Sequence, residues 1–467
     1  MSYGSGIRQR LYNASPAFIK NAIATAYGMQ QRRARYGDDF VSNLALLLQL
    51  QYWPRDSLLA YQQAQTAQFL RKMVPATPYY ASRPEYVDAA RTGDLSGLPL
   101  LSKSIVKNSP REFINSELKE IPHRMVHTSG TTGQALVFPM ANSCFQREYA
   151  YKQIHYSWGR VSLLNRRPFA FCAGHPVTGP GQKKPPFWTY DHANNHLFMS
   201  SYHMSEQNLP LYIRELERFR PVMLGGYPSS IYLLALAAQK LGGCAVKPRA
   251  VYTFSETLLD FQRALISEVF GCRVFNWYGN TEICANIVEC ECGEMHLKLE
   301  HSYVEVLNDD DKPCGPGETG RLVCTGFGNP AFPLIRYEVG DVVTLSKNQT
   351  PACGRSGVLV EKVLGRVEDY ILTPDGRMVG RLDHLFKDSV NVAEAQICQD
   401  SRHEVVLKIV KKEMYAEGDE KAILREARSR LGNEIGIRFE YVPAIQRAPT
   451  GKFRFVRSSL FRNGEAI

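Results

Sequence analysis

One stretch combines hydroxyl side chains with glycines in a pattern suited to binding phosphate. In His127-Thr-Ser-Gly-Thr-Thr-Gly133 the glycines stand three residues apart, between two short apolar segments that predict strands. Glycine permits positive φ, so hydroxyls and backbone N–H groups can face one concave side and cradle phosphate oxygens. Gln134 and a strand follow, which excludes the Walker loop of P-loop NTPases. An ordinary Ser/Gly/Thr turn is the alternative. The residues assigned to phosphate are Thr128, Ser129, Gly130, Thr131, Thr132 and Gly133.

A second group follows a predicted buried strand, in Tyr278-Gly-Asn-Thr-Glu282. Tyr278 can stack on adenine, Thr281 can donate to a phosphate, and Glu282 can hold Mg²⁺ through oxygen. Gly279 and Asn280 complete this turn. The alternative is a strand end at which Asn280 caps the next helix. At the end of the preceding strand, Ser255 and Glu256 can offer backbone atoms to a purine.

Three further residues lie near turns later in the chain. Asp341 follows a turn glycine in Pro333-Leu-Ile-Arg-Tyr-Glu-Val-Gly-Asp341, where a carboxylate can accept from both ribose hydroxyls. Gly365-Arg-Val-Glu-Asp369 lies at a shift in composition and predicts a hinge. Lys452 follows a Pro/Gly turn, and if a small domain carries it over a cleft it can meet developing negative charge.

The elements needed to position these residues indicate an α/β protein. Strands alternate with helices between residues 169 and 278, which predicts a parallel sheet whose carboxyl edge holds ligands. Residues 1–75 read as helical, with Pro75, Pro78 and Pro84 expected to end this region, and antiparallel strands predict a small β unit near 295–360. The expected fold is a large domain, residues 1–365, of mixed and parallel sheets with helices, followed by a small α+β lid domain, residues 366–467.

Length and composition limit the function classes. The 467 residues are 44% hydrophobic and 22% charged, and no run of about 18 apolar residues predicts a membrane span. The start of the chain lacks a signal peptide, so a cytoplasmic location is expected. The net charge of +10 is scattered, which fits ATP or coenzyme A, and no nucleic-acid recognition motif accompanies it. The 11 cysteines are unevenly spaced and do not predict a disulfide framework.

The order of these motifs resembles the adenylate-forming superfamily, within it the phenylacetate–CoA ligase and CapK-like branch. Further support comes from Pro78-Tyr-Tyr, Leu100-Leu-Ser-Lys103, Gly225-Gly-Tyr-Pro-Ser-Ser and Arg381-Leu-Asp-His-Leu-Phe-Lys. The resemblance implies that residues 129–133 hold the β- and γ-phosphates and that Glu282 binds Mg²⁺. It also implies that Asp341 and Arg366 contact the ribose and that Lys452 catalyses adenylation. Gln134 departs from the lysine of many relatives, which weakens the expected grip on pyrophosphate.

The same resemblance implies a structural zinc site. Cys290, Cys292, His296 and Cys353 match positions of a zinc knuckle in this branch, which would pin the β unit to the sheet. Pro351 replaces a cysteine of the usual Cys-x-Cys-Gly-Arg run, so the fourth ligand stays open between Cys292, Cys284 and His301. A reduced cluster without metal is the alternative.

The reaction implied by the resemblance activates a carboxylic acid with ATP and passes the acyl group to an acceptor. The acid pocket is expected between residues 225–230, the strand that ends at Tyr278 and residues 151–158. Its expected lining residues are Gly226, Tyr227, Pro228, Phe254 and Trp277, with an aryl or arylacetic acid as the substrate class. Coenzyme A is the expected acceptor, with an amine in polysaccharide or natural-product biosynthesis as the rival. A catalytically inactive nucleotide-binding homologue is the rival outside the enzymes. Self-association as a homodimer is left open.

Overall fold

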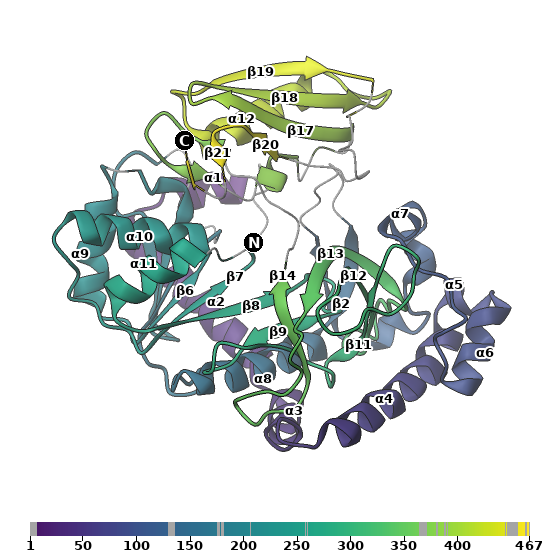
Figure 1. The fold of residues 1–467 in the computed structure, drawn as a ribbon. Coiled ribbons are helices and arrows are strands. Elements are labelled where there is room, and N and C mark those ends of the chain that lie inside the picture. The colour runs from purple at the N-terminus through teal and green to yellow at the C-terminus, as the bar shows by residue number, and fades with distance from the viewer. Residues whose placement is uncertain are drawn as a thin grey trace.

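The computed structural model describes residues 7–128, 136–174, 178, 182–205, 207–256, 258, 260–363, 371–379, 382–386, 389, 391–443, 445, 456–462 and 465–466. Its central feature is a 12-stranded sheet in the order β11-β12-β13-β14-β10-β9-β8-β7-β6-β3-β5-β4 (Figure 1). The strands from β5 to β8 in this order run parallel, as predicted. Their bounds are Phe169–Ala173 for β3, His196–Ser200 for β5, Met223–Gly226 for β6, Ala250–Phe254 for β7 and Arg273–Gly279 for β8. Strand β4, Trp188–Asp191, forms the edge and runs antiparallel to β5.

The parallel strands are buried on both faces, so alternate residues pack into two different cores. Cys172, Leu224 and Val274 belong to the core beneath the helices of one face. Phe169, Met223 and Phe275 belong to the core of the other face. The helices of the first face are α9 (Leu209–Phe219), α10 (Pro228–Lys240) and α11 (Asp260–Phe270). Continuous apolar strands of this kind are typical of a sheet covered by helices on both sides.

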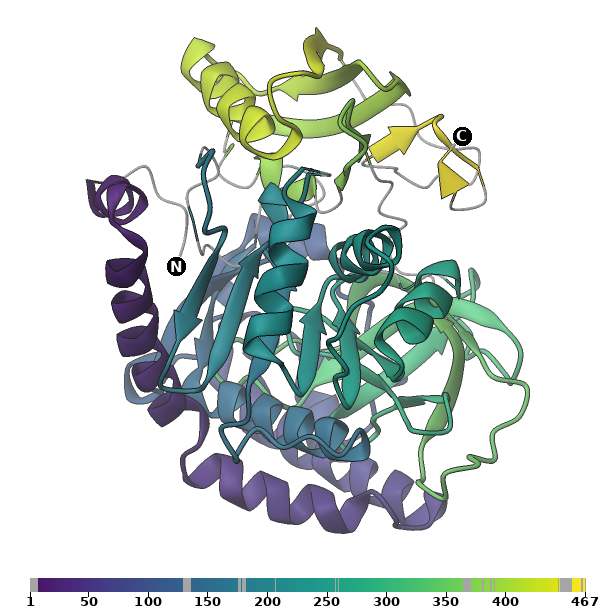
Figure 2. The same ribbon diagram turned by 90° about the vertical axis from the view of Figure 1, so that its left-hand side faces the viewer.

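The second face is covered by helices from two distant parts of the chain. Helix α8, Asn142–Trp158, packs against α3, Asp38–Leu50, and against α2, Ala17–Arg35. Figure 2 shows α2, in dark purple, running alongside the edge of the sheet. There the Asn21 side chain accepts from the Tyr190 N–H at 3.0 Å, and Thr25 accepts from the His192 N–H at 3.1 Å. Helix α2 therefore pairs with backbone groups that the edge strand β4 would otherwise present to solvent.

The antiparallel strands predicted after residue 290 continue the same sheet. Strand β9 pairs antiparallel with β8, and β10 and β14 carry the sheet on to β13, β12 and β11. Their bounds are Asn286–Glu289 for β9, Met295–Leu297 for β10, Ser302–Leu307 for β11, Thr319–Gly326 for β12, Tyr337–Leu345 for β13 and Val358–Val363 for β14.

The phosphate-loop candidate lies in a separate hairpin, as predicted. Strands β1, His123–His127, and β2, Val137–Ala141, pair antiparallel on either side of it.

The N-terminal region is helical well beyond residue 75. Pro78 and Pro84 were expected to end this region, but each occupies the first turn of a new helix, where proline has no N–H to lose. The helices not yet named are α1 (Ile7–Ala14), α4 (Arg55–Ala76), α5 (Pro78–Ala81), α6 (Pro84–Thr92) and α7 (Lys103–Asn108). None of the described helices is long and apolar enough to cross a bilayer.

The C-terminal residues form a smaller α+β unit with its own core, at one side of the large body (Figure 1). Its sheet has the order β19-β18-β17-β20, and helix α12, Glu417–Leu431, supplies Ile423 and Ala427 to the core. The strands of this sheet are β17 (Val392–Ser401), β18 (Glu404–Lys411), β19 (Gly436–Tyr441) and β20 (Val456–Ser458). Two short antiparallel pairs accompany it. Strand β15 (Ile371–Leu372) pairs with β16 (Met378–Val379), and β21 (Phe461–Arg462) pairs with β22 (Glu465–Ala466). The predicted hinge, residues 365–369, lies outside the described residues, so the domain boundary stays a prediction.

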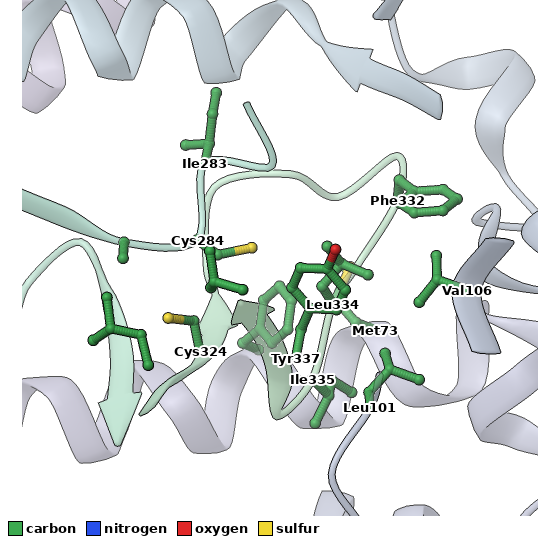
Figure 3. Packing of buried hydrophobic residues seen from close by; sticks show 14 of the residues in the cluster. Met73, Leu101, Val106, Ile283, Cys284, Cys324, Phe332, Leu334, Ile335 and Tyr337 are labelled. Atoms are coloured by element: carbon green, nitrogen blue, oxygen red, sulfur yellow. The ribbon is translucent and has the colours of Figure 1, made fainter. Parts of the chain in front are cut away.

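One hydrophobic core joins the N-terminal helices to the strands that carry the site motifs. Figure 3 shows Met73 of α4 and Val106 of α7 packing near Phe332 and Tyr337, with Ile283 in the same cluster. Tyr80 adds hydrogen bonds, since its hydroxyl donates to the Pro333 carbonyl and accepts from the Ile335 N–H. This core fixes the turn after β8 relative to the start of β13.

Gly226, at the end of β6, tests the packing of the parallel strands. A Cβ at this position would lie 2.0 Å from the Cys172 carbonyl oxygen, and the φ of Gly226 is +157°. We expect Gly226→Ala to lower the free energy of unfolding by about 2 kcal/mol or more, because backbone atoms cannot yield to the methyl group. Urea unfolding followed by circular dichroism measures the change.

Gly97→Ala is the matched control, because a methyl group on Gly97 would meet nothing within 4 Å among the described residues beyond its chain neighbours. Equal stability losses in both variants would contradict this account of Gly226.

Candidate active site

Three motifs far apart in the sequence meet at the carboxylate of Glu282. The Tyr337 hydroxyl donates to Glu282 Oε1 at 3.1 Å, and Lys103 Nζ lies 3.5 Å from the same oxygen. Lys103 opens α7, Glu282 follows β8, and Tyr337 begins β13. The carboxylate is 6% exposed. A carboxylate so buried needs these partners, because desolvation of an unpaired charge is costly.

A second contact joins the end of strand β8 to strand β13. The Tyr278 hydroxyl donates to Asp341 Oδ2 at 2.7 Å, so two residues predicted to contact one nucleoside are neighbours in space. Burial is the main cause that raises the pKa of Tyr278 well above its usual value, with the negative Asp341 adding to it, so the phenol stays protonated. Nearby, the Asn280 side chain lies beside the Tyr278 hydroxyl, and its buried Nδ2 has no well-aligned acceptor within the described residues. An unsatisfied donor of this kind is suited to a ligand.

The expected helix after Asn280 is absent from the described segment that follows. Residues 280–285 form a turn that leads into strand β9, and Asn280 Oδ1 accepts from the Cys284 N–H at 2.8 Å. The capping interpretation of Asn280 is therefore wrong. Its side chain closes a turn that places Thr281 at the surface and Glu282 inside.

Three of the eight described non-glycine residues with positive φ lie beside this site. Ser255, Ile283 and Arg336 have φ of +69°, +54° and +46°. Positive φ is unusual for any residue with a Cβ, and most costly for a β-branched one such as Ile283. Ile283 follows Glu282 directly, and Arg336 precedes Tyr337. Arg336 is held in place by two hydrogen bonds to the Glu305 carboxylate, at 2.8 and 2.9 Å. The strain sets the two partners of the Glu282 contact in position.

The end of strand β7 is tied to the start of helix α10. Glu256 Oε2 accepts from the Ser229 N–H at 3.2 Å, which places a negative charge at the positive end of the helix. The Tyr227 and Phe254 rings meet edge to face, with centroids 6.4 Å apart. The turn at Gly226, Tyr227 and Pro228 is thereby fixed to the strand end that carries Ser255.

The described residues include only the neck of the phosphate-loop candidate. Thr128 N donates to the Leu136 carbonyl at 2.9 Å, and Leu136 N donates to Thr128 Oγ1 at 3.0 Å. Thr128 is buried and its hydroxyl accepts a bond that closes the loop, so this contact is structural. The loop residues proper and two further site residues lie outside the described residues, and their roles stay predictions. These are Ser129, Gly130, Thr131, Thr132, Gly133, Arg366 and Lys452.

A cavity of about 670 Å³ opens beside the turn after β8. It lies between the sheet and the helices α2 and α8. Phe254, Ser255, Trp277, Gly279, Asn280 and Thr281 line it, so predicted nucleotide and substrate residues share one cavity. Gly226, Tyr227 and Pro228 are not among its lining residues, and their contact with a substrate stays a prediction.

Sequence reasoning missed one wall of this cavity. Helix α8 contributes Glu148, Tyr149, Lys152 and Tyr156, of which Lys152 and Tyr156 belong to the segment 151–158 expected beside the acid. Helix α2 contributes Tyr27, Gln31 and Arg35, which were not expected there. Arg35 stood in a run of arginines that predicts only a charged surface. The close approach that brings α2 here depends on Gly28, whose Cβ would lie within 2.4 Å of the Asp191 carboxylate.

The buried histidine His155 packs against Trp277, which lines the cavity. The His155 ring lies 5.3 Å from the Trp277 ring, and Nε2 donates to the Glu289 carbonyl at 2.9 Å. This bond fixes the tautomer and leaves Nδ1 without a partner among the described residues. Burial, with a smaller contribution from Lys298, lowers the pKa of His155 to about 3. The imidazole is therefore neutral at any pH near 7.

The metal-site candidate is largely as predicted but has one different member. Ligand atoms of Cys290, Glu294, His296 and Cys353 all lie within 4.8 Å of one another. Cys353 Sγ is 3.4 Å from His296 Nε2, and Cys290 Sγ is 4.0 Å from Glu294 Oε2. Four ligands around zinc lie roughly 3.4 to 3.8 Å apart, given the usual bond lengths. Two thiols, an imidazole and a carboxylate therefore fit the ion in type and nearly in spacing.

Cys292 does not join this group, which corrects the predicted ligand set. Its side chain is exposed, and its backbone N–H points at Cys290 Sγ at 3.4 Å. The tight turn from Cys290 to Gly293 causes this, because it directs alternate side chains away from one another. The other two candidates are engaged elsewhere: Cys284 is buried in the core shown in Figure 3, and His301 bonds Glu148 at 2.7 Å.

The chain is similar to known proteins along most of its length. A family model described as the CapK C-terminal domain matches residues 371–459. The chain is 24% identical to protein CapK of Staphylococcus aureus over 469 residues, covering 96% of this chain and 99% of that protein. It is 23% identical to a phenylacetate-coenzyme A ligase of Thermus thermophilus, covering 69% of this chain and 74% of that protein.

Among solved structures, the crystal structure of 2-hydroxyisobutyryl-CoA ligase with 2-HIB-AMP and CoA, in the thioesterification state, is similar at a TM-score of 0.56 and 16% identity. It covers 87% of this chain and 91% of that chain. The predicted fold class is confirmed, and so is the resemblance to the phenylacetate–CoA ligase and CapK-like branch.

His155 gives a prediction about stability and pH. Its pKa in the folded chain is below the unfolded value of about 6.5, so only the unfolded chain takes up this proton as the pH falls towards 3. Between pH 7 and pH 5 this lowers the free energy of unfolding by about 2 kcal/mol. His155→Gln keeps a donor for Glu289 and should reduce the pH-dependent loss by that amount, measured by urea unfolding at both pH values.

His192→Gln, which removes an exposed histidine, is the matched control. If His155→Gln and wild type lose the same stability between the two pH values, the neutral buried state of His155 is refuted.

Proposed function

We propose that this chain, similar along nearly its whole length to protein CapK and over 69% of its length to a phenylacetate-coenzyme A ligase, is an adenylate-forming ligase that activates a carboxylic acid with ATP. The observation that carries this proposal is the meeting of three separate motifs at Glu282, through Lys103 and Tyr337. A structural role alone does not require strained residues on both sides of such a contact. The proposal concerns the site between the turn after β8 and strand β13.

In the proposed complex the nucleoside lies against Tyr278 and Asp341, which already adjoin each other. Tyr278 offers its ring to adenine and Asp341 accepts from ribose hydroxyls, joined by Arg366. Ser255 and Glu256 line the purine, and the loop from Ser129 to Gly133 holds the phosphates. The buried donor of Asn280 is available to the same ligand. Support comes from the cavity, which reaches this turn through Gly279, Asn280 and Thr281.

In the first half-reaction a carboxylate oxygen of the acid attacks the α-phosphorus of ATP. The new C–O–P linkage forms as the bond to the β-phosphate oxygen breaks, giving acyl-AMP and pyrophosphate. An anion attacks an anion, so the barrier is electrostatic, and the chain contributes alignment and positive charge. Glu282 would hold Mg²⁺, which supplies charge neutralisation when bound. Lys452 is assigned to the developing charge, and Thr281 to a phosphate oxygen.

In the second half-reaction an acceptor attacks the acyl carbon and AMP leaves. Coenzyme A is the first candidate, which would make the protein an AMP-forming acid–thiol ligase. An amine acceptor is the second candidate. It is kept because the similarity to protein CapK covers 96% of this chain, whereas the similarity to the phenylacetate-coenzyme A ligase covers 69%.

We also assign residues 366–467 to a domain that moves between the half-reactions. The separate core of its described residues supports independent movement. A cation–π contact joins it to the large body, with Arg430 5.1 Å from the Tyr202 ring. Arg430 is buried, and a desolvated contact of this kind contributes about 2 kcal/mol, which the movement would have to offset.

The zinc assignment is a separate part of the proposal. Cys290, Glu294, His296 and Cys353 would hold one ion that connects the β9–β10 hairpin to the loop before β14. Closed sites with four protein ligands serve structure and leave no position for substrate. Arg355 supports the group, with its guanidinium bound at 2.7 and 2.9 Å to the Glu291 carboxylate.

Lys452→Ala tests the reaction. Carboxylate-dependent exchange of pyrophosphate into ATP should fall by about 100-fold or more, because an electrostatic contact to the transition state is lost. ATP binding, measured by calorimetry, should change little. Lys421→Ala is the matched control, since Lys421 is an exposed lysine of α12 in the same unit. Normal exchange in Lys452→Ala would remove this residue from the mechanism.

Metal analysis tests the zinc site and separates the two ligand sets. The purified chain should contain about one zinc ion, and Cys290→Ser should lose most of it. Cys292→Ser is the matched control and should keep the metal, because Cys292 faces solvent. Loss of zinc in Cys292→Ser, or its absence from the wild-type chain, would refute the assignment.

A further inference from the structure

Two cations face the cavity across a single tyrosine ring. The Arg35 guanidinium carbon lies 4.5 Å from the centroid of the Tyr149 ring, and Lys152 Nζ lies 4.8 Å from the same centroid. Arg35 ends helix α2 and Lys152 lies in α8, so two covering helices contribute one charge each. Both side chains are half-buried, and both line the cavity. A tyrosine face attracts a cation but leaves its full charge in place.

The carboxylates of the cavity wall are bound to other partners. Asp191 accepts from the N–H groups of Ala193 and Asn194 and from the Asn194 side chain. Glu148 accepts from the His301 ring at 2.7 Å. Lys152 lies one helical turn from Glu148 and stabilises its charge, yet no carboxylate oxygen lies within 4.0 Å of Lys152 or Arg35 in the described part of the chain. The two carboxylates of the wall are therefore occupied by hydrogen-bond donors, whereas Arg35 and Lys152 have no carboxylate oxygen of the described residues in direct contact and can meet an anion in the cavity.

These cations lie away from the end of the cavity that meets the proposed nucleotide site. That end is formed by Gly279, Asn280 and Thr281, after β8. Along α8 the lining residues run from Phe145, which packs against the core that contains Ile283, to Tyr156. Lys152 lies about 10 Å along the helix from Phe145, at 1.5 Å per residue. Tyrosine side chains line the cavity beyond Lys152. The centroids of the Tyr156 and Tyr252 rings are 4.3 Å apart, and Tyr252 lies two residues before the end of β7.

The phenols around Arg35 are suited to bind an anion together with it. Burial raises the pKa of Tyr36 and of Tyr156, so both hydroxyls stay protonated and able to donate. Tyr36 and Tyr149 lie edge to face with centroids 5.8 Å apart, and both line the cavity. The group that suits a guanidinium, an ammonium and phenolic O–H donors is an oxyanion.

We propose that the acid activated by this protein carries a second anionic group, which Arg35 and Lys152 hold at the end of the cavity remote from the nucleotide. This inference rests on the proposed function. The carboxylate that reacts would lie at the turn of Gly279 to Thr281, and an apolar middle section would lie against Phe254 and Trp277. The second group is a carboxylate, sulfonate or phosphate. The substrate class is then a dianionic aryl or alkyl acid in place of a simple aryl acid.

Matched pairs of acids test the inference. Acid-dependent pyrophosphate release is measured for phenylacetate against para-carboxyphenylacetate, benzoate against isophthalate, and hexanoate against adipate. We expect kcat/KM of the wild-type chain to be at least about tenfold higher for the dianionic member of one or more pairs, because charge-assisted hydrogen bonds are worth about 10- to 100-fold. Arg35→Gln and Lys152→Met should each reduce that preference roughly tenfold, and Lys152→Glu should reverse it.

Arg33→Gln is the matched control, because Arg33 is exposed, lies two residues before Arg35 and does not line the cavity. Equal use of both members of every pair by the wild-type chain would overturn the inference and leave the proposed function standing. Preference that survives in Arg35→Gln and Lys152→Met would also overturn it. Absence of pyrophosphate release with every acid would overturn the proposed function, and the inference with it.

Discussion

The structure depends on one constraint: its parallel strands are buried on both faces. Alternate side chains of β3, β6, β7 and β8 enter two separate cores, so the strands leave only apolar and aromatic side chains, such as Phe254 and Trp277, to wall the cavity. The polar groups of the site come from where the strands end. Ser255 follows β7, and the turn from Gly279 to Glu282 follows β8. The positive φ values at these ends are the cost of turning the chain sharply out of a packed sheet.

The Glu282 contact shows how such a turn becomes a defined charge site. Tyr337 and Lys103 offset the desolvation of the carboxylate, and both come from elements that the core beneath them holds in place. An electrostatic site is effective when its groups need not reorganise during the reaction. Met73 and Phe332 therefore serve the same end as the charged residues, by keeping α7 and the start of β13 in register with the turn (Figure 3).

Sequence reasoning predicted the parts of the fold that depend on local pattern. The strands β7 and β8, helix α8 and the hairpin β1–β2 follow from apolar periodicity and turn residues. The pocket wall formed by α2 could not be predicted, because it depends on the fit of Gly28 against Asp191, about 160 residues away in the sequence. Cys292 was assigned to the metal group because spacing alone does not say which way a side chain points in a tight turn, and Glu294 was missed for the same reason.

Helix α2 has two tasks that cannot be separated. Asn21 and Thr25 occupy backbone groups of the edge strand β4, while other residues of the same helix wall the cavity (Figure 2). An uncovered edge strand is a template for pairing with other chains. Changes in α2 that widen or narrow substrate choice by shifting the helix would therefore also expose β4 and promote aggregation. A change of substrate specificity in this protein is thus coupled to its resistance to aggregation. Substitutions that change side chains of α2 but leave the helix in place can alter specificity without exposing β4.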